Sequence, residues 1–377
     1  MQYSYRRNKL FEDKTDRKGV QVFNVKTEQT VNTLTKTIRE VKGKYIPWGD
    51  DDRLGEQIAD LYNNSPLHAS IIKGKANLIS GNRFEFDTNK ELSWYLDSPN
   101  TQQSLEELTY SIAFQISLYG QAYVQFSLIN GKPVARKVLN SLQCRVNKEN
   151  TKVFTSESFA LNREIDEFNQ FSLIKPSNNM VMVLRENTLN EHYCIPNYIT
   201  GALDITNDGA LQKQINSALN RGFMPKLKIV LNDEPDNEEE AKKIMDNINE
   251  QLTGLQADRS NALVVFGESN DVKIEEIQIK NLDEQFEVYQ EAVERRILFA
   301  HNIPSKALVG LANASSLGNA TELRNAYAIY LQSTIRPVRK VIERCYEKDL
   351  KLKGIWTKFE IKDDFLENLE EQNRNEI

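Results

Sequence analysis

The sequence has few of the residues that build disulfides, metal centres or membrane spans. Only three cysteines and three histidines occur among 377 residues, so neither a disulfide framework nor a C-x-x-C metal site is expected. No run approaches the roughly 18 apolar residues of a membrane helix, and the first ten residues lack the hydrophobic stretch of a signal peptide. These absences predict a globular, soluble chain in a reducing compartment, with no membrane partner.

The charge balance argues against a chain that condenses on nucleic acid. Acidic residues number 54 and basic residues 48, which gives a net charge of −6, and the two signs are interspersed. Such a molecule should repel DNA as a whole. Hydrophobic residues make up 40% of the chain, and single cores stop growing at about 250–300 residues, so we expect more than one structural region.

The motifs of common enzyme sites are missing. Lys73-Gly74-Lys75-Ala76 is only superficially a phosphate loop, because Ala69 stands at the first glycine position and Ala76 replaces the magnesium-binding Ser or Thr. We interpret Asp50-Asp51-Asp52 as a hydrated loop. No metal-ligand spacing connects the three histidines, which we interpret as surface or core residues: His68, His192 and His301. The sequence therefore predicts no catalytic residue, no metal and no cofactor.

The pattern over the first half of the chain predicts a mixed α+β region. Apolar spacing indicates a helix over residues 53–78, which Ser65-Pro66 should interrupt. A second helix is expected over 104–118. It leads into an alternating strand over 121–129, and Asn130-Gly131 then favours a hairpin turn.

The next region alternates long helices with a small insert. We expect one helix from Pro196 to Arg221 and another over 282–301. Between them, strands at 226–231 and 262–266 should flank a helix that opens at the acidic segment 235–240. The region between the long helices is therefore predicted to be a compact βαβ insert.

A loop of small residues and a long helix come last. Residues 309–319 show no helical charge pattern. Asn319 and Glu322 resemble a capping pair for the helix that follows, and Pro337 should kink it. One face of this helix is apolar or small: Leu323, Tyr327, Tyr330, Thr334, Val338, Val341 and Cys345.

This order of elements resembles the portal proteins of tailed phages, of the HK97 type. Short motifs in the same order and spacing carry the resemblance, which spans residues 46–352. These motifs are similar to the family's SPLH, GNAY and IP..LLG segments and to its last helix. In this sequence they lie at residues 46–49, 61–68, 71–73, 79–81, 118–123, 302–304, 308–310 and 335–337.

The resemblance implies a ring, usually of twelve copies, built from an α+β portal fold. Its parts would be an α+β wing, a long helical stem, a small βαβ clip, a tunnel loop and a long kinked helix. Carried over by position, the segments are 1–44 (N-terminal arm), 45–196 (wing), 197–221 (stem helix), 222–281 (clip), 282–305 (second stem helix), 306–320 (tunnel loop), 321–353 (long kinked helix) and 354–377 (short crown or acidic tail).

Four glutamates recur on one face of the helix expected over 282–301. Glu284, Glu287, Glu291 and Glu294 are spaced by three, four and three, and such neighbours repel by about 0.2–0.5 kcal/mol each. Two interpretations stay open. The face is either a solvated surface relieved by Arg295 and Lys280, or a tunnel wall that repels phosphates so that DNA slides.

Two further segments complete the candidate site. Residues of the tunnel loop would touch the DNA backbone without reading its sequence: Lys306, Leu311, Asn313, Ser315, Ser316 and Asn319. An acidic segment of the clip is either a soluble turn or a docking surface for a motor or adaptor: Asp233, Glu234, Asp236 and Glu238.

The resemblance also implies the partners and the location. They are copies of the chain itself, double-stranded DNA bound without sequence specificity, the large terminase, a head–tail adaptor, and the major capsid and scaffold proteins. The chain would assemble in the host cytoplasm and end in the virion, at a capsid vertex. Another head–tail connector or structural ring protein remains an alternative, because long amphipathic helices demand partner packing of any kind. A nucleic-acid-processing enzyme is disfavoured by the missing motifs.

Overall fold

The computed structural model divides the chain into two compact units, which are described separately. One unit comprises Met1–Thr30 and Ile215–Phe286, and the other comprises Val31–Gln214 and Glu287–Ile377. The residues that the structure describes are 44–49, 52–87, 92, 95–96, 99–100, 102–159, 164–186, 192–220, 226–231, 243, 263–266, 273–277, 282–309 and 320–362. Nearly all of the predicted arm and the last fifteen residues lie outside them.

A helical corner opens the larger unit. Helix α1 (Leu54–Asn64) and helix α2 (Pro66–Ser80) meet at Ser65. The Ser65 hydroxyl accepts the backbone N–H of His68 at 3.1 Å, and Pro66 takes the first helical position, where its missing N–H costs nothing. The predicted interruption at Ser65-Pro66 is confirmed.

Helix α4 (Leu105–Tyr119) begins and ends as its sequence indicates. Ser104 and Glu107 form a reciprocal capping box, and Gly120 closes the helix with a φ of +72°. The chain continues directly into β2 (Gln121–Ile129), which turns at Asn130 and Gly131 into β3 (Lys132–Leu139). Both turn residues have positive φ, as a tight hairpin requires, so the predicted hairpin is confirmed.

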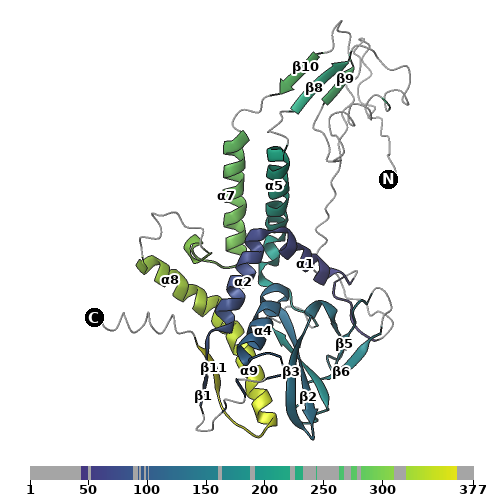
Figure 1. The fold of residues 1–377 in the computed structure, drawn as a ribbon, viewed down its shortest axis with the longest axis vertical. Coiled ribbons are helices and arrows are strands. Elements are labelled where there is room, and N and C mark those ends of the chain that lie inside the picture. The colour runs from purple at the N-terminus through teal and green to yellow at the C-terminus, as the bar shows by residue number, and fades with distance from the viewer. Residues whose placement is uncertain are drawn as a thin grey trace. The chain divides into compact units, whose positions relative to one another are not determined.

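The hairpin belongs to a six-stranded sheet with the order β3-β2-β7-β6-β5-β4. Its neighbours are antiparallel except for the β6–β7 pair. Four strands complete the sheet: β4 (Cys144–Val146), β5 (Lys152–Thr155), β6 (Asp166–Gln170) and β7 (Asn179–Arg185). A short 3-10 turn, η1 (Ser141–Gln143), links β3 to β4. The sheet and the helices beside it form an α+β layer structure (Figure 1).

Two long helices, α5 (Ala202–Asn220) and α7 (Leu282–Ala300), have most of their residues in the larger unit. The first does not start at Pro196 as predicted, because a 3-10 turn, η2 (Asn197–Gly201), comes between them. Its predicted end at Arg221 lies outside the described residues. After α7 the chain turns through His301 and Asn302, whose φ is +56°, into η3 (Lys306–Val309).

The C-terminal helix is divided by a π-helical turn. Helix α8 (Ala320–Tyr330) runs into the π turn η4 (Leu331–Ile335), and α9 (Arg336–Leu352) follows. The irregularity expected at Pro337 thus lies just before it. Proline has no N–H, and its ring crowds the carbonyl four residues earlier. A π turn, which is wider than an α-helical turn, accommodates both effects. The predicted inward face is confirmed, with Leu323 and Val341 half-buried and the others buried.

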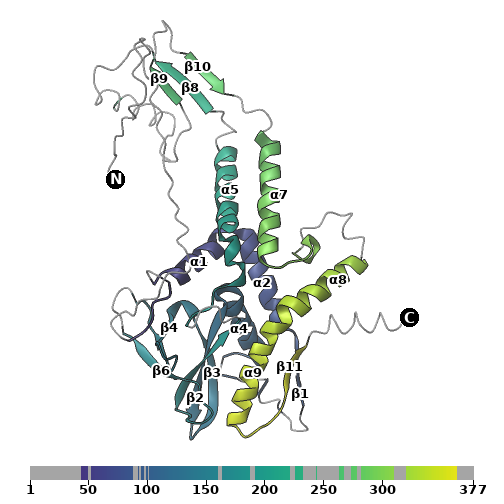
Figure 2. The same cartoon turned by 180° about the vertical axis from the view of Figure 1, so that it is seen from behind.

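The chain returns to its start through a two-stranded sheet. Strand β1 (Arg83–Phe86) pairs with β11 (Phe359–Lys362) in antiparallel register. Figure 2 shows this pair beside α9, seen from the back. A continuous core of buried residues joins α2, α4, the large sheet and α9. Trp48, fully buried, stacks on Tyr193 with ring centres 5.6 Å apart.

The smaller unit contains a three-stranded sheet with the order β10-β8-β9. Strand β8 (Lys226–Leu231) is parallel to β9 (Leu263–Phe266), and β10 (Lys273–Ile277) is antiparallel to β8. Parallel neighbours need a crossover connection, which agrees with the predicted βαβ order. The helix predicted to open at residue 235 lies outside the described residues, and β10 was not predicted.

Candidate functional site

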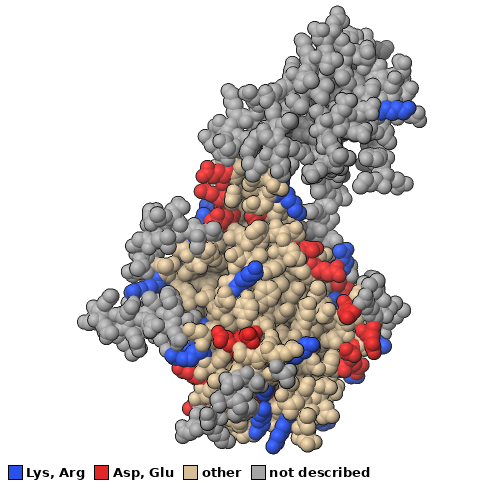
Figure 3. Space-filling model, viewed as in Figure 1, with Lys and Arg blue, Asp and Glu red and all other residues tan. Residues whose placement is uncertain are grey.

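The acidic face predicted on α7 is exposed at Glu287 and Glu291 and half-buried at Glu294. Glu287 and Glu291 are exposed, whereas Val293, Ile297 and Leu298 are buried. Figure 3 shows acidic atoms gathered where the described part of α7 reaches the surface. The side chain of Glu284 lies outside the described residues. The helical phase therefore places Glu287 and Glu291 on the exposed side of α7, together with Val288 and Phe299, and places an apolar face on the buried side.

The innermost glutamate of this face meets the first residue of the predicted tunnel loop. The Lys306 ammonium lies 2.8 Å from a carboxylate oxygen of Glu294. Arg295, which we expected to relieve the acidic face, is exposed. Arg296 instead pairs with Asp204 of α5 at 3.3 Å. Two pairs thus tie the end of α7 to its surroundings, while the charges of Glu287 and Glu291 remain directed to solvent.

Close backbone approach fixes the base of α5. A Cβ at Gly201 would lie 2.6 Å from the Cβ of Ala300 on α7, and a Cβ at Gly209 would lie 2.4 Å from the carbonyl oxygen of Asn64. Neither distance allows a larger residue without a shift of the backbone. These two glycines let α5 pack directly on α7 and on the corner between α1 and α2.

A buried polar cluster joins this base to the α1–α2 corner. Ser65 donates to Asp208 of α5 at 2.6 Å, and one ring nitrogen of His68 lies 2.9 Å from a ring nitrogen of His301. Tyr198 stacks on His301 with ring centres 4.9 Å apart and donates its hydroxyl to the carbonyl of Leu118 at 2.5 Å. All of these polar side chains are buried. The cluster connects the ends of α2, α5 and α7.

The histidine pair is held in its neutral form by burial. Desolvation lowers the pKa of His68 to about 4. Burial, together with the nearby His68 and Lys75, lowers the pKa of His301 well below its ordinary value. The hydrogen bond between the rings needs one donor and one acceptor nitrogen, which neutral imidazoles supply. We interpreted both histidines as surface or core residues; both lie in the core, and the structure also places their rings in contact.

Sequence reasoning missed this pair because no local signal marks it. The two histidines are separated by 233 positions, and neither has a carboxylate or cysteine at ligand spacing. The buried pair between Arg136 and Asp349 was missed for the same reason: its partners are 213 positions apart.

Asp52, interpreted as part of a hydrated loop, pairs with Arg145 at 2.6 Å. That interpretation was wrong for Asp52, because it overlooked a partner in β4.

Several predicted residues lie outside the described part of the chain. They are the loop residues Leu311, Asn313, Ser315, Ser316 and Asn319, and the acidic residues of the insert Asp233, Glu234, Asp236 and Glu238. The segment at Lys73-Gly74-Lys75 forms the middle of α2, so it is no phosphate loop. Lys75 is buried there and pairs with Glu186 at 3.2 Å.

Neither a metal-binding cluster nor a membrane-spanning helix occurs within the described residues. No three His, Cys, Asp or Glu side chains of that part of the chain lie together as metal ligands would. No helix within it combines the length and apolar character needed to cross a bilayer. The three cysteines are buried and form no disulfide with one another.

Apolar side chains are also exposed on the helices around this site. Phe299 of α7 is 83% exposed and Val288 of the same helix 69%. Leu203 of α5 and Ile329 of α8 are exposed as well. Large apolar residues on neighbouring helices are typical of surfaces that another chain covers.

The sequence matches the family model described as phage portal protein over residues 72–376. The chain belongs to this portal family. No curated protein matches the sequence. The predicted α+β portal fold is therefore confirmed, and so is the resemblance on which it rested.

Solved structures share the portal fold at low sequence identity. A chain from the neck of an empty gene transfer agent particle, computed with C6 symmetry, is 16% identical with a TM-score of 0.59, covering 84% of this chain and 85% of that one. A chain from the native neck, computed with C12 symmetry, gives 16% and 0.58, covering 85% and 86%. An HK97-family phage portal protein from Corynebacterium diphtheriae gives 13% and 0.53, covering 82% and 96%.

Proposed function

We propose that this portal chain assembles with copies of itself into a closed ring of twelve at a capsid vertex, and that double-stranded DNA is packaged and later released through the ring. The family match over residues 72–376 carries the proposal. It is supported by the fold shared, over 85% of this chain, with a chain from a neck computed with C12 symmetry. The chain would enter the virion after assembly in the host cytoplasm.

The exposed apolar residues of the long helices support the ring. A lone exposed Val or Phe needs no explanation in a monomer, but Val288, Phe299 and Leu203 lie on the two neighbouring helices α5 and α7. In a closed ring each subunit uses two different surfaces, and a neighbour on either side would cover these side chains. Burial of a side chain such as Phe contributes about 1.5–3 kcal/mol.

The acidic face of α7 supports a channel through which DNA passes without being held. With twelve copies, a net charge of −6 per chain gives −72. If Glu287 and Glu291 face the channel, their charges repel phosphates and prevent tight, salt-bridged contacts. The tunnel loop would touch only the DNA backbone, so that translocation is independent of sequence.

The remaining partners follow from this role. A chain that only forms the channel needs a separate motor, so the large terminase would dock on the insert that includes Asp233, Glu234, Asp236 and Glu238 and would hydrolyse ATP. A head–tail adaptor would later take the same end of the ring. The major capsid and scaffold proteins would contact the wing, residues 45–196.

Electron microscopy of the purified protein, with class averages viewed down the symmetry axis, tests the proposal. We expect a closed ring of about twelve subunits with a hole wide enough for duplex DNA. Val288→Lys should weaken the ring, because it places a charge in the contact. Ile174→Lys, which alters a residue that is 90% exposed in the β6–β7 loop, should leave it intact.

Two outcomes would contradict the proposal. A ring whose hole cannot pass duplex DNA would indicate another structural ring protein of the neck. A monomer under all conditions, including in the presence of scaffold protein, would exclude self-assembly as the basis of the function.

A further inference from the structure

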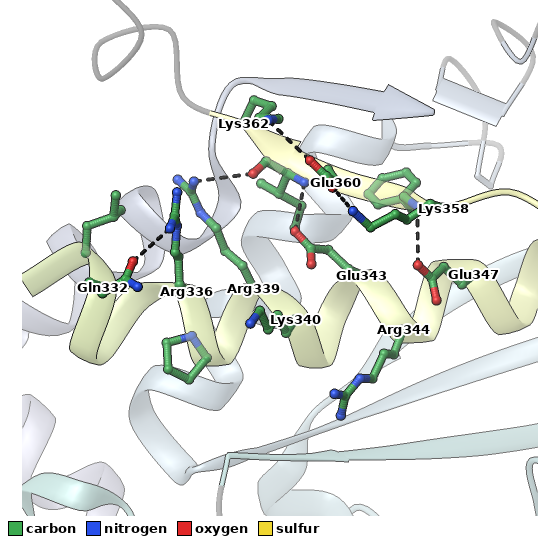
Figure 4. A pocket seen from close by; sticks show the side chains of 14 residues that line it. Gln332, Arg336, Arg339, Lys340, Glu343, Arg344, Glu347, Lys358, Glu360 and Lys362 are labelled. Atoms are coloured by element: carbon green, nitrogen blue, oxygen red, sulfur yellow. Dashed lines mark hydrogen bonds and ion pairs between the residues drawn. The ribbon is translucent and has the colours of Figure 1, made fainter. Parts of the chain in front are cut away.

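A groove of about 610 Å³ runs along α9 beside β11. Its lining includes Arg336, Lys340 and Arg344 of the helix and Lys358 and Lys362 of the strand region (Figure 4). The three residues of α9 are spaced by four, which places them in one row about 6 Å apart. All three are exposed. The groove is thus bordered by a row of cations on a single helix.

The carboxylates of the groove are already engaged. Glu343 accepts the backbone N–H of Ile361 at 3.0 Å, and Glu347 accepts that of Phe359 at 3.3 Å. Glu360 pairs with Lys358 and, at 3.2 Å, with Lys362. In the part of the chain that the structure describes, Lys340 and Arg344 have no carboxylate partner. The unbalanced charge of the groove is therefore positive.

The same contacts restrict how the groove can bind a peptide. The outer edge of β11 would ordinarily accept an added strand. Here Glu343 and Glu347 occupy its N–H groups from α9, as Figure 4 shows, while Lys340 and Arg344 point away from β11. A peptide would therefore be held by charge along α9 rather than by pairing with the strand.

The segment that follows β11 has the complementary charge. Residues 363–377 contain six carboxylates and one cation, Arg374, which is five net negative charges, and they also contain Phe365, Leu366 and Leu369. The segment starts immediately after Lys362, which itself lines the groove. Fifteen residues can span up to about 50 Å, so the tail is long enough to turn back along α9.

We propose that the acidic C-terminal segment 363–377 docks on its own chain along α9, at the open border of the α9–β11 groove, with its carboxylates on Arg336, Lys340 and Arg344. Docking neutralises the row of cations and keeps this surface from other polyanions; that polyanion would be DNA, a role which rests on the proposed function. The contact is a surface one between charges, so it should weaken as salt increases.

The test uses the full chain and a labelled peptide of residues 363–377. In one variant the six tail carboxylates become amides: Asp363→Asn, Asp364→Asn, Glu367→Gln, Glu370→Gln, Glu371→Gln and Glu376→Gln. Fluorescence anisotropy should show that this amide-tail chain binds the peptide about tenfold more tightly than the wild-type chain, whose own tail competes. Binding should weaken between roughly 50 and 300 mM salt.

Charge reversal locates the site. In the amide-tail chain, Lys340→Glu with Arg344→Glu should weaken peptide binding about tenfold. The matched control is Lys132→Glu with Lys137→Glu, which reverses two exposed lysines of β3 and should leave binding unchanged. Equal circular dichroism spectra would show that each variant is folded.

Three results would overturn the proposal. The amide-tail chain binds no peptide, or the wild-type chain binds it equally well, or the control pair weakens binding as much as the α9 pair. If the amide-tail chain binds duplex DNA through Lys340 and Arg344 but no peptide, the row is a nucleic-acid surface and not a tail dock.

Discussion

At the level of single residues, buried polar groups hold distant parts of the larger unit together. Arg136 of β3 and Asp349 of α9 form an ion pair of 2.7 Å with both side chains buried, and Tyr95 donates to the same carboxylate at 2.8 Å. Taking both charges out of water is costly, so the pair adds little net stability. Removing one partner alone is a different matter, because the other charge then stays buried without compensation.

Arg136→Met should therefore lower the free energy of unfolding by about 3–5 kcal/mol, because it leaves Asp349 charged and buried. Urea denaturation followed by circular dichroism measures the change. The control is Lys152→Ala, which breaks the exposed pair with Glu167 and should cost less than about 1 kcal/mol. Similar losses for both variants would show that burial of the ion pair is not what makes Arg136 important.

The histidine pair predicts how stability depends on pH. Burial lowers the pKa of His68 from 6.5 to about 4 and lowers that of His301 as well. At a pH between 6.5 and about 4, the imidazoles bind protons in the unfolded chain but remain neutral in the folded chain. Stability should therefore fall as the pH drops from about 6.5 to about 4, by on the order of 3 kcal/mol for His68 alone.

His301→Gln separates this contribution from that of the carboxylates. The variant should be less stable than the wild type at pH 7, since it disturbs a packed cluster, but it should lose less stability between pH 7 and pH 5. Thermal unfolding at a series of pH values measures how the stability of the variant and of the wild type changes with pH. An equal change for both proteins would mean that the histidine pair does not titrate as its burial requires.

At the level of elements, caps and glycines set where the helices end. The capping box at Ser104 and the left-handed Gly120 define α4, and the sequence carried both signals. The π turn before Pro337 was not visible in the sequence, because a widened turn and a kink both satisfy a proline in a helix. Tyr330, just before the π turn, and Ile335, its last residue, are both buried.

Replacement by alanine should have opposite effects on stability at Gly74, within α2, and at Gly81, just after the helix ends. Gly81 has a φ of +60°, and a Cβ there would lie 2.4 Å from the carbonyl oxygen of Lys362 on β11. Gly81→Ala should therefore destabilise the fold by about 1–3 kcal/mol. Gly74 is exposed within the helix with open space around it, so Gly74→Ala should stabilise by about 0.5–1 kcal/mol.

Chemical denaturation of both glycine variants beside the wild type decides this prediction. If Gly81→Ala were as stable as Gly74→Ala, the close approach of β11 to the end of α2 could not be a constraint on the fold.

At the level of the whole molecule, the charge of its wall decides whether a channel binds DNA or lets it pass. The chain is acidic overall, yet its described surface carries both signs, with the exposed Glu287 and Glu291 on α7 and a basic row on α9. The proposed ring would need the first of these surfaces toward the DNA. The second would need a cover, which the acidic tail supplies under our inference.

Glu287→Lys with Glu291→Lys should make the assembled ring retain duplex DNA, because the reversed face attracts phosphates. We expect affinity to rise about tenfold or more at low salt and to fall steeply as salt increases. Filter binding at several salt concentrations measures this. Reversing Glu164 and Asp166, exposed residues at β6, should have little effect; an equal rise there would assign the change to net charge alone.

The sequence by itself determined the elements that carry local signals. Periodic spacing, caps and turn residues located α4, the β2–β3 hairpin, the break at Ser65-Pro66 and the inward face of the last helix, because these depend on near neighbours. Ordered motifs also indicated the portal family. The predicted segment boundaries and the roles of the loop and clip residues stay predictions.

Only the tertiary structure decided which distant residues meet. It brought His68 to His301, Arg136 to Asp349, Lys306 to Glu294, and β1 to β11. No single sequence reveals such contacts, because the partner of a buried polar side chain is far away along the chain and comes close to it only in the folded structure. The groove beside α9 arises in the same way, from a strand that ends next to a helix only after both have packed.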